Sequence, residues 1–270
     1  MRGNVVVLLG KNGINIGSLQ VKRLERLHIG TSGWSYKEWK GLYYPEKLKP
    51  IQYLNFYSQE FKCVEVNTSF YHLPRAQTVL NWALAVPEDF KFCPKLSRYI
   101  SHYQKLHDAT DSLRLFFTIF DPIKDKLGPI LIQLPAQVPF NREVAEAFFA
   151  LLKSVYGEYV FALEVRHETW LEPQSVELLQ QYDISLVIAQ SAMPFPYHEI
   201  ITARDVYLRF HGPGKLYASR YDDAAMLSYA QMSAAWLREG RSVWVFFNNT
   251  FHGDAIENAR LLEAYILSQI

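Results

Sequence analysis

Residues 205–211 read Asp-Val-Tyr-Leu-Arg-Phe-His, so that apolar side chains at 206, 208 and 210 alternate with a second set that ends in Arg209 and His211. Successive side chains of a β-strand point to opposite faces. In a barrel of parallel strands one face packs on the outer helices and the other faces the lumen. The stretch therefore predicts a barrel strand that carries charged side chains to the lumen at its C-terminal end.

Apolar runs of this length recur along the chain and are separated by helix-length segments. The eight candidate strands are residues 27–32, 63–67, 91–96, 129–134, 160–166, 184–190, 205–211 and 242–248. Alternation of strand and helix predicts parallel strands joined by right-handed crossovers. Eight such strands within 270 residues predict an α/β fold of the TIM type, a (β/α)8 barrel. No Gly-x-Gly-x-x-Gly turn follows any of them, which argues against a dinucleotide-binding sheet.

The connecting segments carry helix signals, with one exception. Apolar residues at three- and four-residue spacing predict helices over 141–156, 222–239 and 254–269. Asp222 and Asp254 are suited to capping two of them, and Gly240 is suited to ending one. Residues 191–204 contain two prolines, Pro194 and Pro196, so we expect an irregular or missing helix between strands six and seven.

Composition narrows the class of protein. The formal net charge of +1 gives no global field that would attract nucleic acid, so any preference for an anion must be local. Two cysteines are too few for a disulfide framework. No apolar run approaches the ~20 residues that span a bilayer, so we expect a cytoplasmic protein without a membrane partner. We expect residues 1–26 to form an extension, either a surface strap or disordered, and residues 27–270 to form a single barrel domain.

The phase of each strand predicts which polar residues face the lumen. Apolar residues on the alternate positions send inward Glu65, Asn67, Glu164, Arg166, Arg209 and His211 and, less securely, Lys95, Gln133, Gln190 and Asn248. All lie in the last part of their strands, where barrel active sites are built. Among the five ionised groups, three cations face two carboxylates. The surplus cation favours an anionic ligand such as a phosphate, and the alternative is an ion-pair network that plugs the barrel.

Aromatic residues follow the same strands. Those nearest the predicted mouth are Trp34, Tyr36, Trp39, Phe70, Tyr71, Trp170, Tyr217 and Tyr221. Aromatic faces beside cations suit stacked bases or sugars, and the alternative is that they pack against one another. We predict ligand-binding roles for Trp34, Asn67, Tyr71, Lys95, Gln133, Arg166, Trp170, Arg209, Tyr217, Tyr221 and Asn248.

Three kinds of function fit these residues. The first is a hydrolase or lyase for a phosphate- or sugar-bearing, nucleotide-like substrate, with Glu164 as base, His211 as acid and Glu65 as second carboxylate. Two carboxylates would also suit glycoside hydrolysis. The second is a non-catalytic module for a nucleotide or single-stranded nucleic acid, for which the basic run from Lys91 to His107 is a candidate surface. The third is a Schiff-base enzyme that uses Lys95.

A cofactor is not expected. Only His211 has a secure inward phase among the histidines, and there is no His-Glu-x-x-His or paired-cysteine motif. A divalent metal is the weaker version of the hydrolase hypothesis.

Several motifs along the chain resemble the DUF72 (YecE-like) family. They are Gly30-Thr31-Ser32-Gly33-Trp34 with Tyr36, Trp39, Gly41, Tyr44 and Pro45; Glu65-x-Asn67-x-x-Phe70-Tyr71-x-Leu73-Pro74; Phe90-x-Phe92-x-x-Lys95-x-x-Arg98-x-Ile100-x-His102; Gln133-Leu134-Pro135; Glu164-x-Arg166-His167-x-x-Trp170; Arg209-x-His211-Gly212 with Tyr217 and Tyr221; and Phe247-Asn248-Asn249 with Gly253, Ala255, Asn258 and Ala259. The resemblance runs from about residue 28 to the end and rests on many motifs in order.

The resemblance implies a TIM-barrel fold and no particular activity. Similarity of such barrels to endonuclease IV-like proteins implies nucleic-acid binding or metal-dependent phosphodiester cleavage as hypotheses. Gln190 stands where members of the family often carry an aspartate, and residues 1–26 precede the usual start. The first departure puts an additional carboxylate, and with it a metal site, in doubt.

Overall fold

A computed structural model describes residues 16–270 of the chain. Residues Ile16–Leu24 form helix α1. Of the extension predicted over 1–26, residues 1–15 lie outside the described residues, and the described part contains this helix.

Nine strands are found in the described part of the chain. They are β1 Leu27–Thr31, β2 Cys63–Val66, β3 Lys91–Pro94, β4 Ile130–Gln133, β5 Phe161–Glu164, β6 Ser185–Leu186, β7 Ile188–Gln190, β8 Asp205–Phe210 and β9 Ser242–Phe247. Each lies within a predicted strand, and β6 and β7 are the two halves of the predicted strand over 184–190. All pairings between them are parallel, as the crossover argument predicts.

Sheet pairings, isolated bridges and one chain connection join neighbouring strands around a ring. Hydrogen-bonded sheets have the orders β1-β9-β8-β7, β2-β3 and β4-β5-β6, and the chain itself joins β6 to β7. A bridge between Ser32 and Glu65 connects β1 to β2, and a bridge between Lys95 and Leu131 connects β3 to β4. The fold is the predicted TIM-type barrel.

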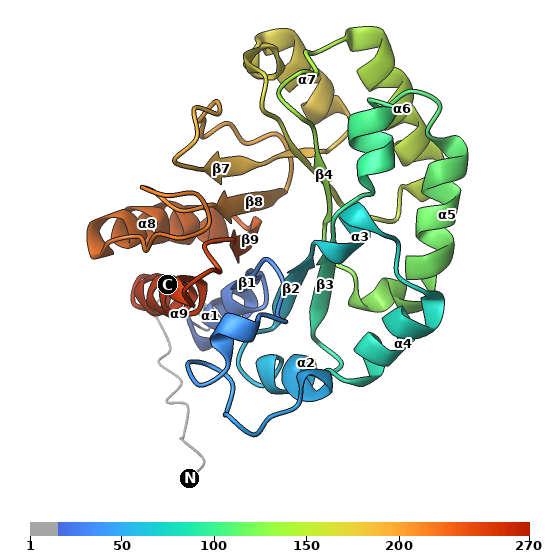
Figure 1. The fold of residues 1–270 in the computed structure, drawn as a ribbon. Coiled ribbons are helices and arrows are strands. Elements are labelled where there is room, and N and C mark those ends of the chain that lie inside the picture. Colours follow the sequence, from blue (N-terminus) through green and yellow to red (C-terminus); the bar gives the residue numbers. More distant parts are fainter. Residues whose placement is uncertain (1–15) are drawn as a thin grey trace.

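Helices lie outside this ring of strands (Figure 1). Besides α1 they are α2 Tyr53–Tyr57, α3 Thr68–Tyr71, α4 Ala76–Leu84, α5 Thr110–Phe120, α6 Arg142–Tyr156, α7 Pro173–Gln181, α8 Asp223–Arg238 and α9 Asp254–Leu267. Short turns of other helix types are η1 Lys37–Trp39, η2 Pro50–Gln52, η3 Tyr99–Tyr103, η4 Asp121–Lys126 and η5 Glu168–Leu171. Within residues 16–270 the helices fall short of the length and apolarity that crossing a membrane requires.

Of the three predicted helix-end signals, those at Asp222 and Gly240 are confirmed and that at Asp254 is not. Asn141 caps α6 and Asp222 caps α8, each accepting a hydrogen bond from a backbone N–H of the first turn. The predicted cap Asp254 is wrong, because this residue lies inside α9 and Gly253, with a φ of 81°, occupies the cap position. Gly240 follows α8 with a φ of 87°, the left-handed conformation that glycine adopts freely.

The predicted irregular crossover is also present. Residues 191–204 contain no helix and connect β7 to β8 directly. Phe195 in this segment lies against Arg166, with the guanidinium carbon 4.3 Å from the ring centroid. The segment therefore reaches the mouth of the barrel instead of joining the outer layer of helices.

The lumen is filled in layers. Its middle is apolar and consists of Cys63, Cys93, Leu131, Ala162, Val187, Tyr207, Trp244 and Phe246, all buried. Near the N-terminal end His28 stacks on Trp244, whose indole N–H donates to Asp205 at 2.7 Å. A packed floor of this kind closes the lower barrel, so a ligand can enter only from the C-terminal end of the strands.

Candidate functional site

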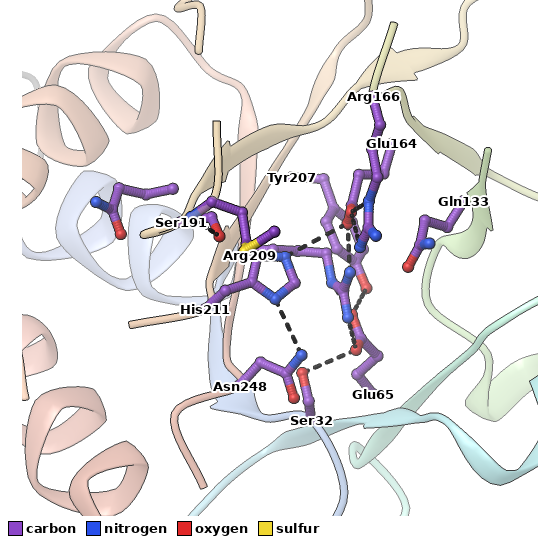
Figure 2. Close-up of polar contacts among 12 residues, drawn as sticks. Ser32, Glu65, Gln133, Glu164, Arg166, Ser191, Tyr207, Arg209, His211 and Asn248 are labelled. Carbon is purple, nitrogen blue, oxygen red and sulfur yellow. Dashed lines mark hydrogen bonds and ion pairs between the residues drawn. The ribbon is translucent and has the colours of Figure 1, made fainter. Parts of the chain in front are cut away.

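Arg209 on β8 is the centre of a buried ion-pair network (Figure 2). Its Nε and Nη2 donate to the two carboxylate oxygens of Glu65 at 2.8 and 2.7 Å. Its Nη1 donates to Glu164 on β5. The Arg209 and Glu164 residues are each 1 % exposed and Glu65 is fully buried, so the network lies beneath the mouth and not in solvent.

Glu65 uses its remaining hydrogen-bonding capacity within the protein. The Ser32 hydroxyl donates to Oε1 at 2.8 Å and the Tyr207 hydroxyl donates to Oε2 at 2.9 Å. Burial alone would raise the pKa of Glu65, but the Arg209 guanidinium overrides it and lowers the pKa below its usual value. Glu65 is an ionised group that holds Arg209 in place.

Glu164 is shared between two arginines. Arg166 donates from Nε and Nη2 to Glu164 Oε1 at 3.3 and 3.2 Å. Burial favours a raised pKa, but Arg209 is close enough to lower the pKa of Glu164 well below its usual value. Two carboxylates thus face two guanidinium groups, so the plug expected as the alternative does form this layer of the barrel.

Lys95 is the cation left over by that pairing. Within residues 16–270 it has no carboxylate within ion-pair distance. Its Nζ donates to the amide oxygen of Gln133 at 2.6 Å and lies 3.9 Å from the centroid of the Phe70 ring. Burial and then the charge of Arg209 lower the pKa of Lys95 from 10.5 to about 7, against the opposing charges of Glu164 and Glu65.

A cavity of about 380 Å³ opens above this layer. It is lined by Tyr36, Glu38, Asn67, Tyr71, Lys95, Gln133, Arg209, His211, Tyr217, Asn248, Thr250 and Phe251. The volume lies in the range of small-molecule sites, and polar groups that converge within aromatic walls are typical of such sites.

His211 lines this cavity, and its two ring nitrogens face Asn248 and Glu164. Its Nδ1 is 3.0 Å from the Asn248 amide nitrogen, which sets Nδ1 as the acceptor. Its Nε2 is buried 3.7 Å from Glu164 Oε2, and it has no hydrogen-bond partner among residues 16–270. Burial and the charge of Arg209 lower the pKa of His211, so the ring is neutral at neutral pH. Asn67 Oδ1 is likewise buried without a partner, and buried polar atoms of this kind are uncommon unless a ligand or water completes them.

The structure brings most of the predicted site residues to one place. Asn67, Tyr71, Lys95, Gln133, Arg209, His211, Tyr217 and Asn248 all line the cavity. Glu65, Glu164 and Arg166 do not line it. The two carboxylates lie beneath Arg209, and Arg166 is covered by Phe195.

The predicted mouth positions of Trp34, Trp170 and Tyr221 are wrong. Trp34 packs edge-on against Trp82 with ring centroids 5.3 Å apart. Trp170 is 1 % exposed, and its indole N–H donates to the Val138 carbonyl at 3.0 Å. All three turn away from the lumen because each finds partners in the shell between strands and helices.

Tyr221 and Gln190 contact each other, and the predicted placement of each is wrong. Inner-facing positions on β6 and β7 are those of Val187 and Ala189, so Gln190 has the outward phase. Tyr221 is buried outside the ring, where its hydroxyl accepts from the Gly212 N–H at 2.9 Å and donates to the Gln190 side chain. The inward placement of Gln190 is therefore wrong.

Four lining residues were not among the predicted site residues: Tyr36, Glu38, Thr250 and Phe251. All belong to loops after β1 and β9, and only Tyr36 carried a signal, as an aromatic that follows a strand. Loop residues do not alternate between two faces as strand residues do, so the alternation argument could not predict which of them line the cavity. Within residues 16–270 there is no group of three or more His, Cys, Asp or Glu side chains that could hold a metal ion.

Comparison with known proteins identifies the family. The model of the family described as "Protein of unknown function DUF72" matches residues 28–269. The chain belongs to the DUF72 family. It is 30% identical over 218 residues to the UPF0759 protein YecE of Escherichia coli strain K12, covering 72% of this chain and 77% of that one.

Two further members of the DUF72 family extend the comparison. The UPF0759 protein YunF of Bacillus subtilis is 25% identical over 268 residues, covering 87% of this chain and 92% of its own length. A crystal structure of a DUF72 family protein from Thermotoga maritima superposes with a TM-score of 0.78 at 29% identity, covering 88% of this chain and 98% of that one. The family is uncharacterised, so family membership supplies the fold and no activity.

Proposed function

We propose that the mouth of this DUF72 barrel binds a small ligand that carries a phosphate or similar anion next to a sugar-like or other hydroxylated body. The observation that carries the proposal is the position of Lys95 on the cavity wall with no carboxylate partner. The Glu65, Glu164, Arg166 and Arg209 charges sum to zero, so Lys95 in its ammonium form is the charge of this buried layer that has no ion-pair partner among residues 16–270.

The rest of the lining suits the body of such a ligand. The amides of Asn67, Gln133 and Asn248 offer donors and acceptors to hydroxyl groups. Tyr36, Tyr71 and Tyr217 provide flat faces on which a sugar or base can lie. An acidic side chain, Glu38, also lines the cavity and is exposed.

Chemistry in this cavity would use His211 rather than the two carboxylates. Glu65 and Glu164 are held ionised by Arg209, whereas a hydrolase of the paired-carboxylate kind needs one protonated acid. The neutral imidazole of His211 lines the cavity, and its Nε2 lies 3.7 Å from Glu164 Oε2. A hydrolase or lyase that moves a proton through His211 is the catalytic version of the proposal.

Titration with ribose 5-phosphate, ribose and sodium sulfate tests the proposal by calorimetry. We expect the phosphorylated sugar to bind at least tenfold more tightly than ribose and to be displaced by sulfate. Lys95→Met should abolish the difference between the two sugars, whereas Lys105→Met, which removes an exposed charge, should preserve it. Equal affinities for the two sugars in the wild-type protein would refute the anion site.

A second candidate is single-stranded nucleic acid, supported by a separate observation at the rim. The Arg98 guanidinium lies 5.7 Å from the Tyr71 ring centroid and 5.8 Å from that of Tyr103. Both tyrosines are exposed, so a base could stack beside the arginine. A twelve-residue oligothymidine should then bind with an affinity that falls steeply with salt and that Tyr103→Ala lowers. Binding of the sugar phosphate without binding of the oligothymidine favours the small-ligand proposal.

A further inference from the structure

Lys95 differs from an ordinary buried lysine in its choice of partners. Buried lysines are normally paired with a carboxylate, yet the two carboxylates in this lumen are bonded to Arg209. The Lys95 amine has a neutral amide oxygen, that of Gln133, as its hydrogen-bond acceptor, and an aromatic face, that of Phe70, beside it. None of these contacts requires the amine to keep its third proton.

The charged surroundings favour loss of that proton. The groups that face Lys95 are Glu65 on β2, Glu164 at the end of β5, Arg166 just after it, Arg209 on β8 and His102 in η3. The two guanidinium groups and burial outweigh the two carboxylates, and His102 is itself neutral at neutral pH because burial and then Lys95 lower its pKa to about 4. A large fraction of Lys95 is therefore free amine at neutral pH.

The amine is also reachable. The residue is 7 % exposed and lines the same cavity as His211, Asn67 and Gln133. A nucleophile on a rigid strand end, neighbouring groups that move protons and limited access of water are together the features of a covalent amine catalyst.

We infer that Lys95 forms an imine with a small aldehyde or ketone that carries an anionic group, which makes the site that of a lyase or transferase of the Schiff-base kind. The inference rests on the proposed function, because the anionic group is what brings the carbonyl compound into the cavity. It goes further by naming a carbonyl as the second feature of the ligand and Lys95 as the catalytic residue.

The bond changes balance without a cofactor. The Lys95 lone pair attacks the carbonyl carbon, the C=O π pair moves to oxygen, and one proton passes from nitrogen to that oxygen to give a carbinolamine. The hydroxyl then takes a further proton and leaves as water, while the nitrogen lone pair forms the C=N bond. Water in the cavity, which opens at the C-terminal end of the strands, can relay both protons. The protonated imine keeps the single positive charge that the ammonium form has, so the charge balance with the network is unchanged.

Trapping with glyoxylate and cyanoborohydride at pH 7.5, followed by peptide mapping by mass spectrometry, tests the inference. Glyoxylate unites an aldehyde with a carboxylate, and the hydride converts the protonated imine into a stable secondary amine. We expect Lys95 to be modified at least tenfold faster than the exposed Lys105. Sulfate should slow modification of Lys95 and leave that of Lys105 unchanged. Modification spread evenly over the lysines would overturn the inference.

Two variants separate a nucleophile from a merely structural lysine. Lys95→Arg keeps a positive charge and cannot form an imine, so it should lose the adduct. Gln133→Glu places a carboxylate against the amine and should hold it as ammonium. The trapping rate at pH 7.5 should then fall by at least tenfold and recover at higher pH. An unchanged rate in Gln133→Glu contradicts the inference.

The two proposals fail in different ways. Sulfate and sugar-phosphate binding without any Lys95 adduct would overturn the imine and leave the anion site standing. A wild-type protein that binds neither sulfate nor the sugar phosphate and forms no Lys95 adduct would overturn both proposals. Far-ultraviolet circular dichroism of each variant checks that the barrel is folded, and the wild-type mapping result stands even where a variant fails to fold.

Discussion

Arg209 fixes the charge state of the groups that surround it. A buried guanidinium that bonds two carboxylates holds both of them ionised and points them away from the cavity. The sequence predicted these three residues inside the barrel, because strand phase depends only on alternation. It could not predict their pairing, since Arg166 and Lys95 were equally available partners, and the choice among them depends on side-chain distances across the lumen.

Arg209→Met tests the network at the scale of the residue. The substitution leaves Glu65 and Glu164 buried without their main partner, so we expect the free energy of unfolding to fall by about 3–5 kcal/mol. Urea denaturation at pH 7 measures it. The triple variant Arg209→Met, Glu65→Gln, Glu164→Gln replaces the ions by neutral groups and should recover at least half of the loss. A triple variant no more stable than the single one would show that the arginine matters for packing and not for charge.

At the scale of the element, the strands follow the sequence more closely than the loops do. A strand needs one alternating pattern to fix both its type and its phase, and the patterns at 63–67, 160–166 and 205–211 predicted their inner faces correctly. Trp170 was misplaced because its partner, the Val138 carbonyl, lies 32 residues away in the sequence, and no local pattern reports such a contact. The phase of 184–190 was misread because both alternating sets of side chains in this run are mostly apolar, so alternation does not distinguish its inner face from its outer face.

Gly128 lies just before β4, and its substitution tests how tightly the side chains of the barrel floor are packed. A Cβ added there would lie 2.6 Å from Cys93 Sγ and 2.7 Å from the Trp244 ring, so Gly128→Ala must displace one of them. We expect a loss of about 1–3 kcal/mol in the free energy of unfolding. Gly214→Ala is the matched control, because nothing lies within 4 Å of its added Cβ. Thermal and urea unfolding compare the two, and a Gly128→Ala protein as stable as the control would mean that the floor is loosely packed.

For the whole molecule, the buried ionisable groups predict a stability that falls on acidification in two stages. His28 and His198 are largely buried, and desolvation by burial lowers the pKa of each from 6.5 to about 4. The unfolded chain therefore binds more protons than the native one between pH 6.5 and 4, and the free energy of unfolding falls as the pH is lowered through that window. Glu65 and Glu164 have lowered pKa values in the native state, so their contribution is lost below about pH 4.5.

The two stages can be separated by guanidinium chloride denaturation between pH 7.5 and 3. His28→Gln combined with His198→Gln should make the fall between pH 6.5 and 4 shallower, while His102 and His211 keep part of it, and should leave the steeper fall below pH 4.5. The triple network variant should do the reverse, because it keeps the histidines and removes the two carboxylates. The net charge of +1 adds little self-repulsion near neutral pH, so these buried groups dominate the first stage. A wild-type curve that stays level down to pH 4.5 would mean that both histidines are protonated as easily in the folded barrel as in the unfolded chain.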